Sequence, residues 1–250
     1  MVQLVQMWLW PFFRIAGLLM TAPIIGTRTI PVRVRIVVAV IITVVLFPVI
    51  PKIPGVDPVS AEGIFISIQQ VVTGMAMGLT MRVIFIALEV AGQAIGQLMG
   101  LMLASMVDPT NGNQVPIIGQ FYLLLATLLF LAVDGHLMMI RVLAQSFNSL
   151  PIGSAGISTN MAWEIVTWTG TILRTAVVIA LPAMASLLIV NLSFGVMTRS
   201  APQLNIFAVG FPIMIILGVL IIFFNLSSFV PHMMEMFEEG ISMMQKMVAS

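Results

Sequence analysis

Long intervals without a charged side chain are the feature that most limits what this chain can fold into. Residues 36–51, 63–81, 109–133, 175–198 and 200–234 contain no Asp, Glu, Lys or Arg. A helix needs roughly 20 predominantly apolar residues to cross the hydrocarbon core of a bilayer, and most of these intervals approach or exceed that length. The chain is therefore predicted to be of the membrane type.

Composition and hydrogen bonding indicate which element fills these intervals. Of the 250 residues, 60% are hydrophobic and 8% are charged, whereas a soluble domain carries about 25% charged residues. Backbone groups in hydrocarbon must satisfy their own hydrogen bonds, and the intervals lack the alternation of barrel strands. We predict an all-α fold of integral-membrane-type helical hairpins, with bends at Pro182 and Pro212.

Turn-forming stretches divide the chain into these hairpins. Prolines interrupt residues 51–58, and glycines with polar residues interrupt 150–160. At a third break, Arg199 precedes Ser200, which can cap a helix that Pro202 helps to start. We expect this third break to be the turn of the last long hairpin.

The last long hairpin is expected to run from about Arg174 to Pro231. Beyond it, residues 232–250 place apolar methionines and a phenylalanine at helical spacing, against glutamates and a lysine. This pattern predicts an amphipathic tail helix that lies on a membrane or on a partner.

The N-terminal region indicates whether the chain stays inserted in the membrane and on which side its first loop lies. Its first apolar run is interrupted by Arg14 and has no basic cluster ahead of it, so we expect integral insertion rather than a cleaved signal peptide. Arg28, Arg33 and Arg35 follow this run. The positive-inside tendency would place their loop in the cytoplasm.

A stripe of small residues recurs every four positions in the middle of the chain. It consists of Gly92, Gly96, Gly100 and Ala104. On a helix this spacing gives one face without bulk, which lets another backbone approach closely in a membrane setting. We predict tight helix packing at this face, either within the chain or between subunits.

A polar stripe runs beside the glycines. Arg82, Glu89, Gln93 and Gln97 are related by steps of four and seven, and therefore lie roughly on one side of the same helix. Such groups in a spanning helix usually face a bundle interior or a watery cavity. The alternative is that the Arg82–Glu89 region lies outside the bilayer and the two glutamines bond to a neighbouring helix.

The sequence DGHLMMIR offers titratable groups after another apolar run. Asp134 and Arg141 are seven residues apart and share a helix face, with His136 to one side, so a proton relay is conceivable. A helix end with a cap and a flanking arginine is the favoured interpretation, because a relay needs more titratable partners.

Enzyme chemistry is not indicated. The chain has no cysteine and two histidines, which excludes disulfides and leaves too few ligands for a zinc or iron–sulfur site. It contains no phosphate-binding loop, zinc-binding histidine pair or intramembrane aspartate motif, and Ser154 has no evident histidine partner. We expect no catalysis, no metal and no cofactor, and the net charge of +1 gives no indication of nucleic-acid binding.

The stretch MVDPTNGNQVP, residues 106–116, is a polar island between long apolar segments. Its residues are strong turn formers, so an external turn is the favoured interpretation from the residues alone. Polar side chains at that depth would be costly in lipid, so the alternative is a loop that faces a water-filled lumen or a protein cavity.

Several stretches, taken in order, resemble the FliR family of flagellar and virulence-type type III secretion systems. They are AGQAIGQLMGLMLASMVDPTNGNQVPIIGQFY, DGHLMMI, FNSLPIG and NLSFGVMTRSAPQLNIFAVGFP. The resemblance covers nearly the whole chain, and RSAPQLNIFAVGFP is its most specific part.

The resemblance implies a structural, pore-forming subunit of the flagellar protein export gate. Family members assemble with FliP and FliQ, pass unfolded flagellar subunits across the bacterial inner membrane and seed assembly of the rod proteins. FlhA and FlhB would supply the driving force, and membrane lipid would surround part of the assembly. The location implied is the basal body in the inner membrane, with part on the periplasmic side.

The resemblance also divides the chain into parts. It implies a FliP-like part over 1–160, a FliQ-like hairpin over 161–231 and the tail helix over 232–250. It further implies that a loop projects into the pore and plugs it before export. That loop consists of Val107, Asp108, Pro109, Thr110, Asn111, Gly112, Asn113, Gln114, Val115 and Pro116.

Two other functions stay open at this point. A secondary transporter for a small solute could use Arg82, Glu89, Asp134 and Arg141 as a midplane site, with kinked helices for alternating access. No duplicated broken helix in corresponding halves supports it. The other alternative is a purely structural scaffold without contact to a lumen.

Overall fold

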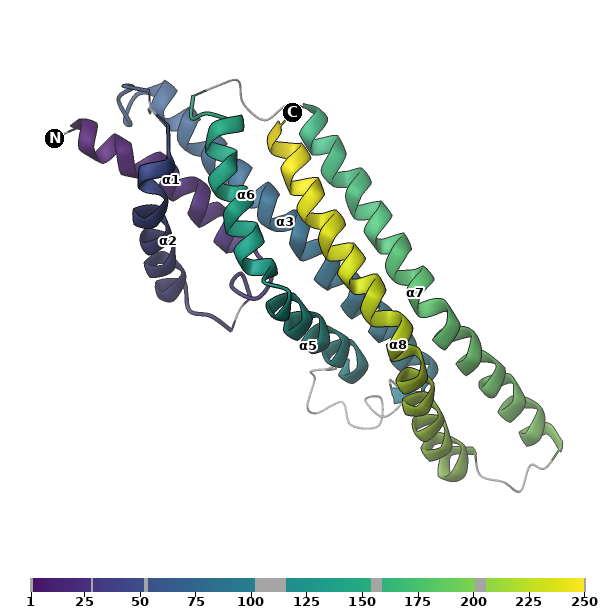
Figure 1. Ribbon diagram of the computed structural model, residues 1–250. Coiled ribbons are helices and arrows are strands. Elements are labelled where there is room, and N and C mark those ends of the chain that lie inside the picture. The colour runs from purple at the N-terminus through teal and green to yellow at the C-terminus, as the bar shows by residue number, and fades with distance from the viewer. Residues whose placement is uncertain are drawn as a thin grey trace. The chain divides into compact units, whose positions relative to one another are not determined.

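The computed structural model describes residues 2–27, 29–51, 54–101, 116–153, 159–200 and 206–249. Its elements, in order, are α1 (Val2–Thr21), α2 (Val32–Leu46), the 3₁₀ turn η1 (Phe47–Val49), α3 (Ala61–Leu98), α5 (Ile117–Ala132), α6 (Gly135–Ser149), α7 (Thr159–Ser200) and α8 (Ile206–Ala249) (Figure 1). None of the described residues forms a β-strand. The all-α prediction is confirmed.

Four stretches of the described helices are long and apolar enough to cross a membrane. They are Val32–Val49, Ala61–Leu98, Met161–Met197 and Gly210–Ala249, and α5 with α6 would add a fifth if this bent pair is one span. Pro182 lies inside α7, and Pro212 and Pro231 lie inside α8, and both helices continue past these residues.

The chain divides into two compact units, each built from segments distant in sequence. The first unit comprises Met1–Ile84, Phe130–Thr171 and Phe237–Ser250, and the second comprises Phe85–Leu129 and Ile172–Met236. The helices α3, α5, α7 and α8 therefore each contribute residues to both units.

In the first unit, α1 is held by a fully buried arginine. Arg14 donates from Nε to Gln70 Oε1 (2.7 Å) on α3 and from Nη1 to Ser146 O (2.9 Å) on α6. Its Nη2 donates to Leu150 O at 2.9 Å, and its guanidinium carbon lies 4.5 Å from the centroid of the Phe147 ring. None of these acceptors is a carboxylate, so the charge is stabilised by oriented dipoles and an aromatic face.

The tail belongs to the same unit from Phe237 onward. The predicted separate tail helix is instead the last part of α8, which continues through Pro231 without a break. Met247 packs with Ala76 of α3 and Met161 of α7, supported by Met243. The apolar face of the tail therefore covers helices of its own chain and buries Ala76 and Met161.

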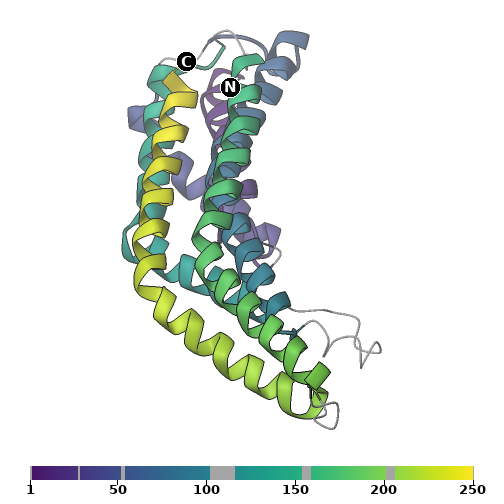
Figure 2. The same ribbon diagram turned by 90° about the vertical axis from the view of Figure 1, so that its right-hand side faces the viewer.

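The second unit contains a hairpin in which parts of α7 and α8 run side by side (Figures 1 and 2). Asn191 Nδ2 on α7 donates to Leu98 O at 2.9 Å. Leu98 is the last residue of α3, so this bond satisfies one of the carbonyls that a helix end leaves without a partner. On α8, the Phe229 ring makes an edge contact with Tyr122 of α5, with centroids 4.4 Å apart.

We predict that Arg14→Met destabilises the protein by at least about 3 kcal/mol, because it leaves the Gln70, Ser146 and Leu150 oxygens without their charged donor. The thermal unfolding midpoint of the detergent-purified protein measures this. Arg33→Met is the control, because Arg33 is exposed and its replacement should change stability by less than about 0.5 kcal/mol. Equal midpoints for the two variants would contradict the role given to Arg14.

Candidate functional site

Part of the predicted site lies outside the described residues. Val107 to Val115 of the polar loop, Ala104 of the glycine stripe and Pro202 of the hairpin turn belong to this part. Pro116 precedes α5, and its carbonyl accepts a hydrogen bond from Gln120 N at 2.8 Å, which starts the helix. Arg199 is exposed in the last turn of α7, and Ser200 is its last residue.

The glycine stripe faces α5 of the same chain, within the second unit. A Cβ atom added to Gly92 would lie 2.7 Å from Tyr122 Cδ2 and 2.8 Å from Ile118 O. The same atom on Gly96 would lie 3.4 Å from Ile118 Cγ1, which is close to an ordinary contact. Of the two positions, only Gly92 therefore requires glycine for packing against α5.

Gly100 departs from the predicted pattern. It lies beyond the end of α3, with φ of +77°, and its N–H donates to Gln97 O at 3.0 Å. This left-handed conformation is readily adopted by glycine and strained for other residues. Gly100 therefore ends the helix and does not extend its packing face.

A glycine on α5 completes the contact with α3. A Cβ atom on Gly119 would lie 2.9 Å from Glu89 O and 3.0 Å from Gln93 Cγ. The glycine stripe of α3 thus meets a glycine on the partner helix. Sequence reasoning missed Gly119, because a single glycine in IIGQF forms no repeat that marks it.

The predicted polar stripe is divided between the units. Arg82 belongs to the first unit, whereas Glu89, Gln93 and Gln97 belong to the second. Glu89 is half-buried, and its Oε1 accepts a hydrogen bond from Gln120 Nε2 at 3.2 Å. Gln120 was not among the predicted residues, and it links the stripe to α5.

The residues of the DGHLMMIR segment do not form a relay in the described structure. Asp134 precedes α6 with φ of 57°, is exposed, and its side chain makes no capping bond. Arg141 is also exposed. The helix boundary lies where it was predicted, but the cap is absent because the left-handed Asp134 does not direct its carboxylate to the free N–H groups.

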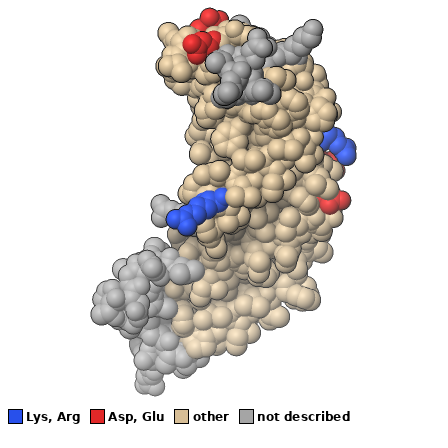
Figure 3. Space-filling view, turned by 90° about the vertical axis from the view of Figure 1, so that its left-hand side faces the viewer, with Lys and Arg blue, Asp and Glu red and all other residues tan. Residues whose placement is uncertain are grey.

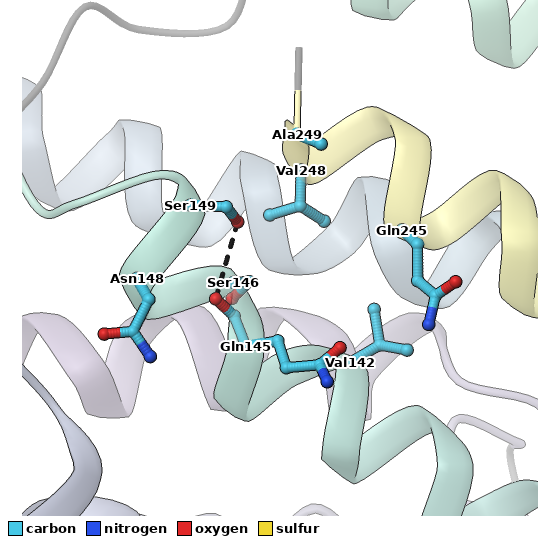
Figure 4. Close-up of a pocket in the computed structure, with 8 residues that line it drawn as sticks. All are labelled: Val142, Gln145, Ser146, Asn148, Ser149, Gln245, Val248 and Ala249. Atoms are coloured by element: carbon cyan, nitrogen blue, oxygen red, sulfur yellow. Dashed lines mark hydrogen bonds between the residues drawn. The ribbon is translucent and has the colours of Figure 1, made fainter.

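A hollow of about 490 Å³ lies in the first unit, between the last turns of α6 and α8 (Figure 4). Its lining consists of Val142, Gln145, Ser146, Asn148, Ser149, Gln245, Val248 and Ala249. Ser149 Oγ donates to Gln145 O at 3.4 Å along the α6 backbone. No ionisable side chain belongs to this lining, so the hollow has no group suited to acid–base chemistry.

Charged side chains are sparse on the surface as well. The face in Figure 3 carries isolated arginine or lysine and acidic residues on an otherwise uncharged surface. Together with the apolar helices and the glycine contact, this defines a helical protein of the membrane type, whose polar residues position helices against one another.

The chain belongs to the family described as bacterial export proteins, family 1, whose model matches residues 5–240. The flagellar biosynthetic protein FliR of Pectobacterium carotovorum subsp. carotovorum is 39% identical over 240 residues, covering 96% of this chain and 91% of the relative. FliR of Escherichia coli (strain K12) is 34% identical over 246 residues, covering 98% and 93%. FliR of Bacillus subtilis (strain 168) is 28% identical over 241 residues, covering 95% and 93%. The predicted resemblance is confirmed.

We predict that Gly92→Ala lowers stability by about 1–3 kcal/mol, because the added methyl group meets the Ile118 carbonyl and the Tyr122 ring. Gly96→Ala and Gly170→Ala should be neutral or stabilising by up to about 1 kcal/mol, because alanine favours the helix. Gly170 is the matched control, since a Cβ atom there has nothing within 4 Å. Unfolding midpoints in detergent compare the three variants, and a stable Gly92→Ala variant would refute the contact.

Proposed function

We propose that this protein is a structural, non-enzymatic and pore-forming subunit of the flagellar type III export gate, which assembles with FliP and FliQ. The observation that carries the proposal is the match to flagellar FliR proteins over at least 95% of this chain in each of the three relatives described. The proposed task is to pass unfolded flagellar subunits across the bacterial inner membrane and to seed assembly of the rod.

Helix length supports an assembly with other proteins. The helices α3, α7 and α8 contain 38, 42 and 44 residues. At 1.5 Å per residue, each is about 57–66 Å long, whereas the hydrocarbon core of a bilayer is about 30 Å thick. Lipid tails alone therefore cannot cover the whole apolar length of an upright helix, and protein partners would cover the remainder.

Exposed apolar side chains in the second unit support the same proposal. On α7 and α8 they include Leu188, Ile189, Leu192, Ile216, Phe223 and Phe224, each more than half exposed. A surface of this kind has to meet either lipid or another protein. In the proposed assembly, FliP and FliQ cover part of it, and FlhA and FlhB act on the assembly from the cytoplasm.

The parts implied by the resemblance complete the proposal. Residues 1–160 correspond to a FliP-like part and 161–231 to a FliQ-like hairpin. The assembly lies in the inner membrane of the basal body, with part on the periplasmic side. Exported flagellar subunits pass through it, and rod proteins contact its outer end.

The loop 107–116 is proposed to restrict the closed pore. Asp108, Asn111, Asn113 and Gln114 would be costly to place in lipid, whereas a water-filled lumen solvates them. The Pro116 carbonyl is fixed in the first turn of α5, which gives the loop a defined point of attachment on one side.

Deleting residues 108–116 should raise the ion conductance of membranes that contain the complete gate, because the obstruction is removed. Patch recordings or ion-sensitive growth measure the leak. Recovery of the complex with FliP and FliQ should be unchanged, which serves as the control for assembly. Unchanged conductance in an assembled deletion variant would count against the plug.

Purification behaviour distinguishes the gate from a small-solute transporter. Asp134 and Arg141, which a transporter would need in a buried site, are exposed. We expect the chain to be recovered in much lower yield when it is expressed alone than when FliP and FliQ are co-expressed. An equal yield of the chain with and without FliP and FliQ would favour the transporter.

A further inference from the structure

Glu89 is a carboxylate on a largely apolar part of the second unit. It is half-buried on α3, and its one hydrogen-bond partner among the described residues is the neutral amide of Gln120. The residues beside these two along α3 and α5 are exposed and apolar. They include Ile86 (42%), Val90 (44%), Ile117 (63%) and Phe121 (42%).

Packed helices hold this carboxylate in place. Gly119 brings the backbone of α5 within close reach of the Glu89 carbonyl and the Gln93 stem. The next residue, Gln120, is thereby fixed beside Glu89 and donates to Oε1 at 3.2 Å. The amide leaves Oε2 free to accept a further hydrogen bond.

Apart from water, few environments suit a half-buried carboxylate at this position. Lipid tails penalise the charge, and the phosphates of lipid headgroups repel it. Arg174 and Arg199 are the cations among the described residues of the second unit, and neither forms an ion pair with Glu89. A lysine or arginine from another protein would neutralise the carboxylate and could bind both of its oxygens.

We propose that the surface formed by Glu89, Gln120 and their exposed apolar neighbours is the docking site for a helix of an unlike subunit, and that this helix carries a lysine or arginine opposite Glu89. The proposal rests on the proposed function, which supplies unlike subunits. The apolar neighbours pack against the incoming helix, and the ion pair fixes its depth and rotation.

Charge reversal tests the site in the complete complex. The chain is co-expressed with FliP and FliQ, and Glu89→Lys should reduce the co-purified subunits by roughly tenfold or more, because two cations then face each other. Glu235→Lys is the matched control, since it makes the same charge change at an exposed position of α8 in the same unit. An undiminished complex with Glu89→Lys, or an equal loss in both variants, would overturn the proposal.

A second measurement covers the case in which Glu89→Lys fails to insert. Each lysine and arginine in the apolar helices of FliP and FliQ is changed to glutamate and combined with Glu89→Lys. Recovery of the complex by one of these reversals is the expected result, because it restores the pair with opposite polarity. If none of these reversals restores the complex, the proposed partner cation is refuted.

A photo-reactive amino acid at Val90 identifies the occupant without disturbing the charge. The expected adduct joins this chain to an unlike subunit, at a peptide that contains a lysine or arginine. An adduct with lipid, an adduct with a second copy of this chain, or no adduct would each refute the proposed occupant. If the unchanged chain does not co-purify with FliP and FliQ at all, the proposed function fails; if it does, a negative result concerns Glu89 alone.

Discussion

The structure depends on one constraint: each buried polar group needs a hydrogen-bond partner, although the chain has very few charged residues. Helices satisfy their own backbone, but a polar side chain that enters the interior must find its partner on another helix. Arg14 meets this condition with acceptors 56 and 132 residues away along the chain. Because these acceptors lie on α3 and α6, one side chain fixes the positions of three helices in the first unit.

The same constraint acts at helix surfaces and ends. Trp168 Nε1 on α7 donates to Thr80 O on α3 at 3.1 Å. In the second unit, Asn191 Nδ2 donates to the carbonyl of Leu98 at the end of α3. Apolar contact alone does not fix how two helices are rotated against each other when both are apolar on every side. Many rotations then bury a similar area. Directional bonds and the close approach at Gly92 and Gly119 select one arrangement.

The sequence allowed the helices and their apolar character to be predicted, because charge-free runs report directly on burial from water. It did not reveal that the tail continues α8, since Pro231 disfavours a helix locally and tertiary packing overrides that preference. Gly100 matched the four-residue repeat but ends α3, because spacing cannot report φ. In the sequence, Arg14 only interrupts an apolar run, because its hydrogen-bond partners are distant along the chain. Glu89 was found from spacing, whereas its bond to Gln120 needed the packing of α5 against α3.

In the proposed assembly, apolar and polar residues make different contributions. Exposed leucines, valines and phenylalanines provide area for association, but they accept lipid and protein contacts alike. A single carboxylate on such a surface accepts very few partners, because an opposing apolar group or carboxylate leaves it unpaired. Because charged residues are scarce, each one has few wrong partners with which it could pair. Each one therefore restricts more strongly which surface can pack against it. In the proposed assembly, the isolated charges on helix faces would therefore decide the choice of neighbour.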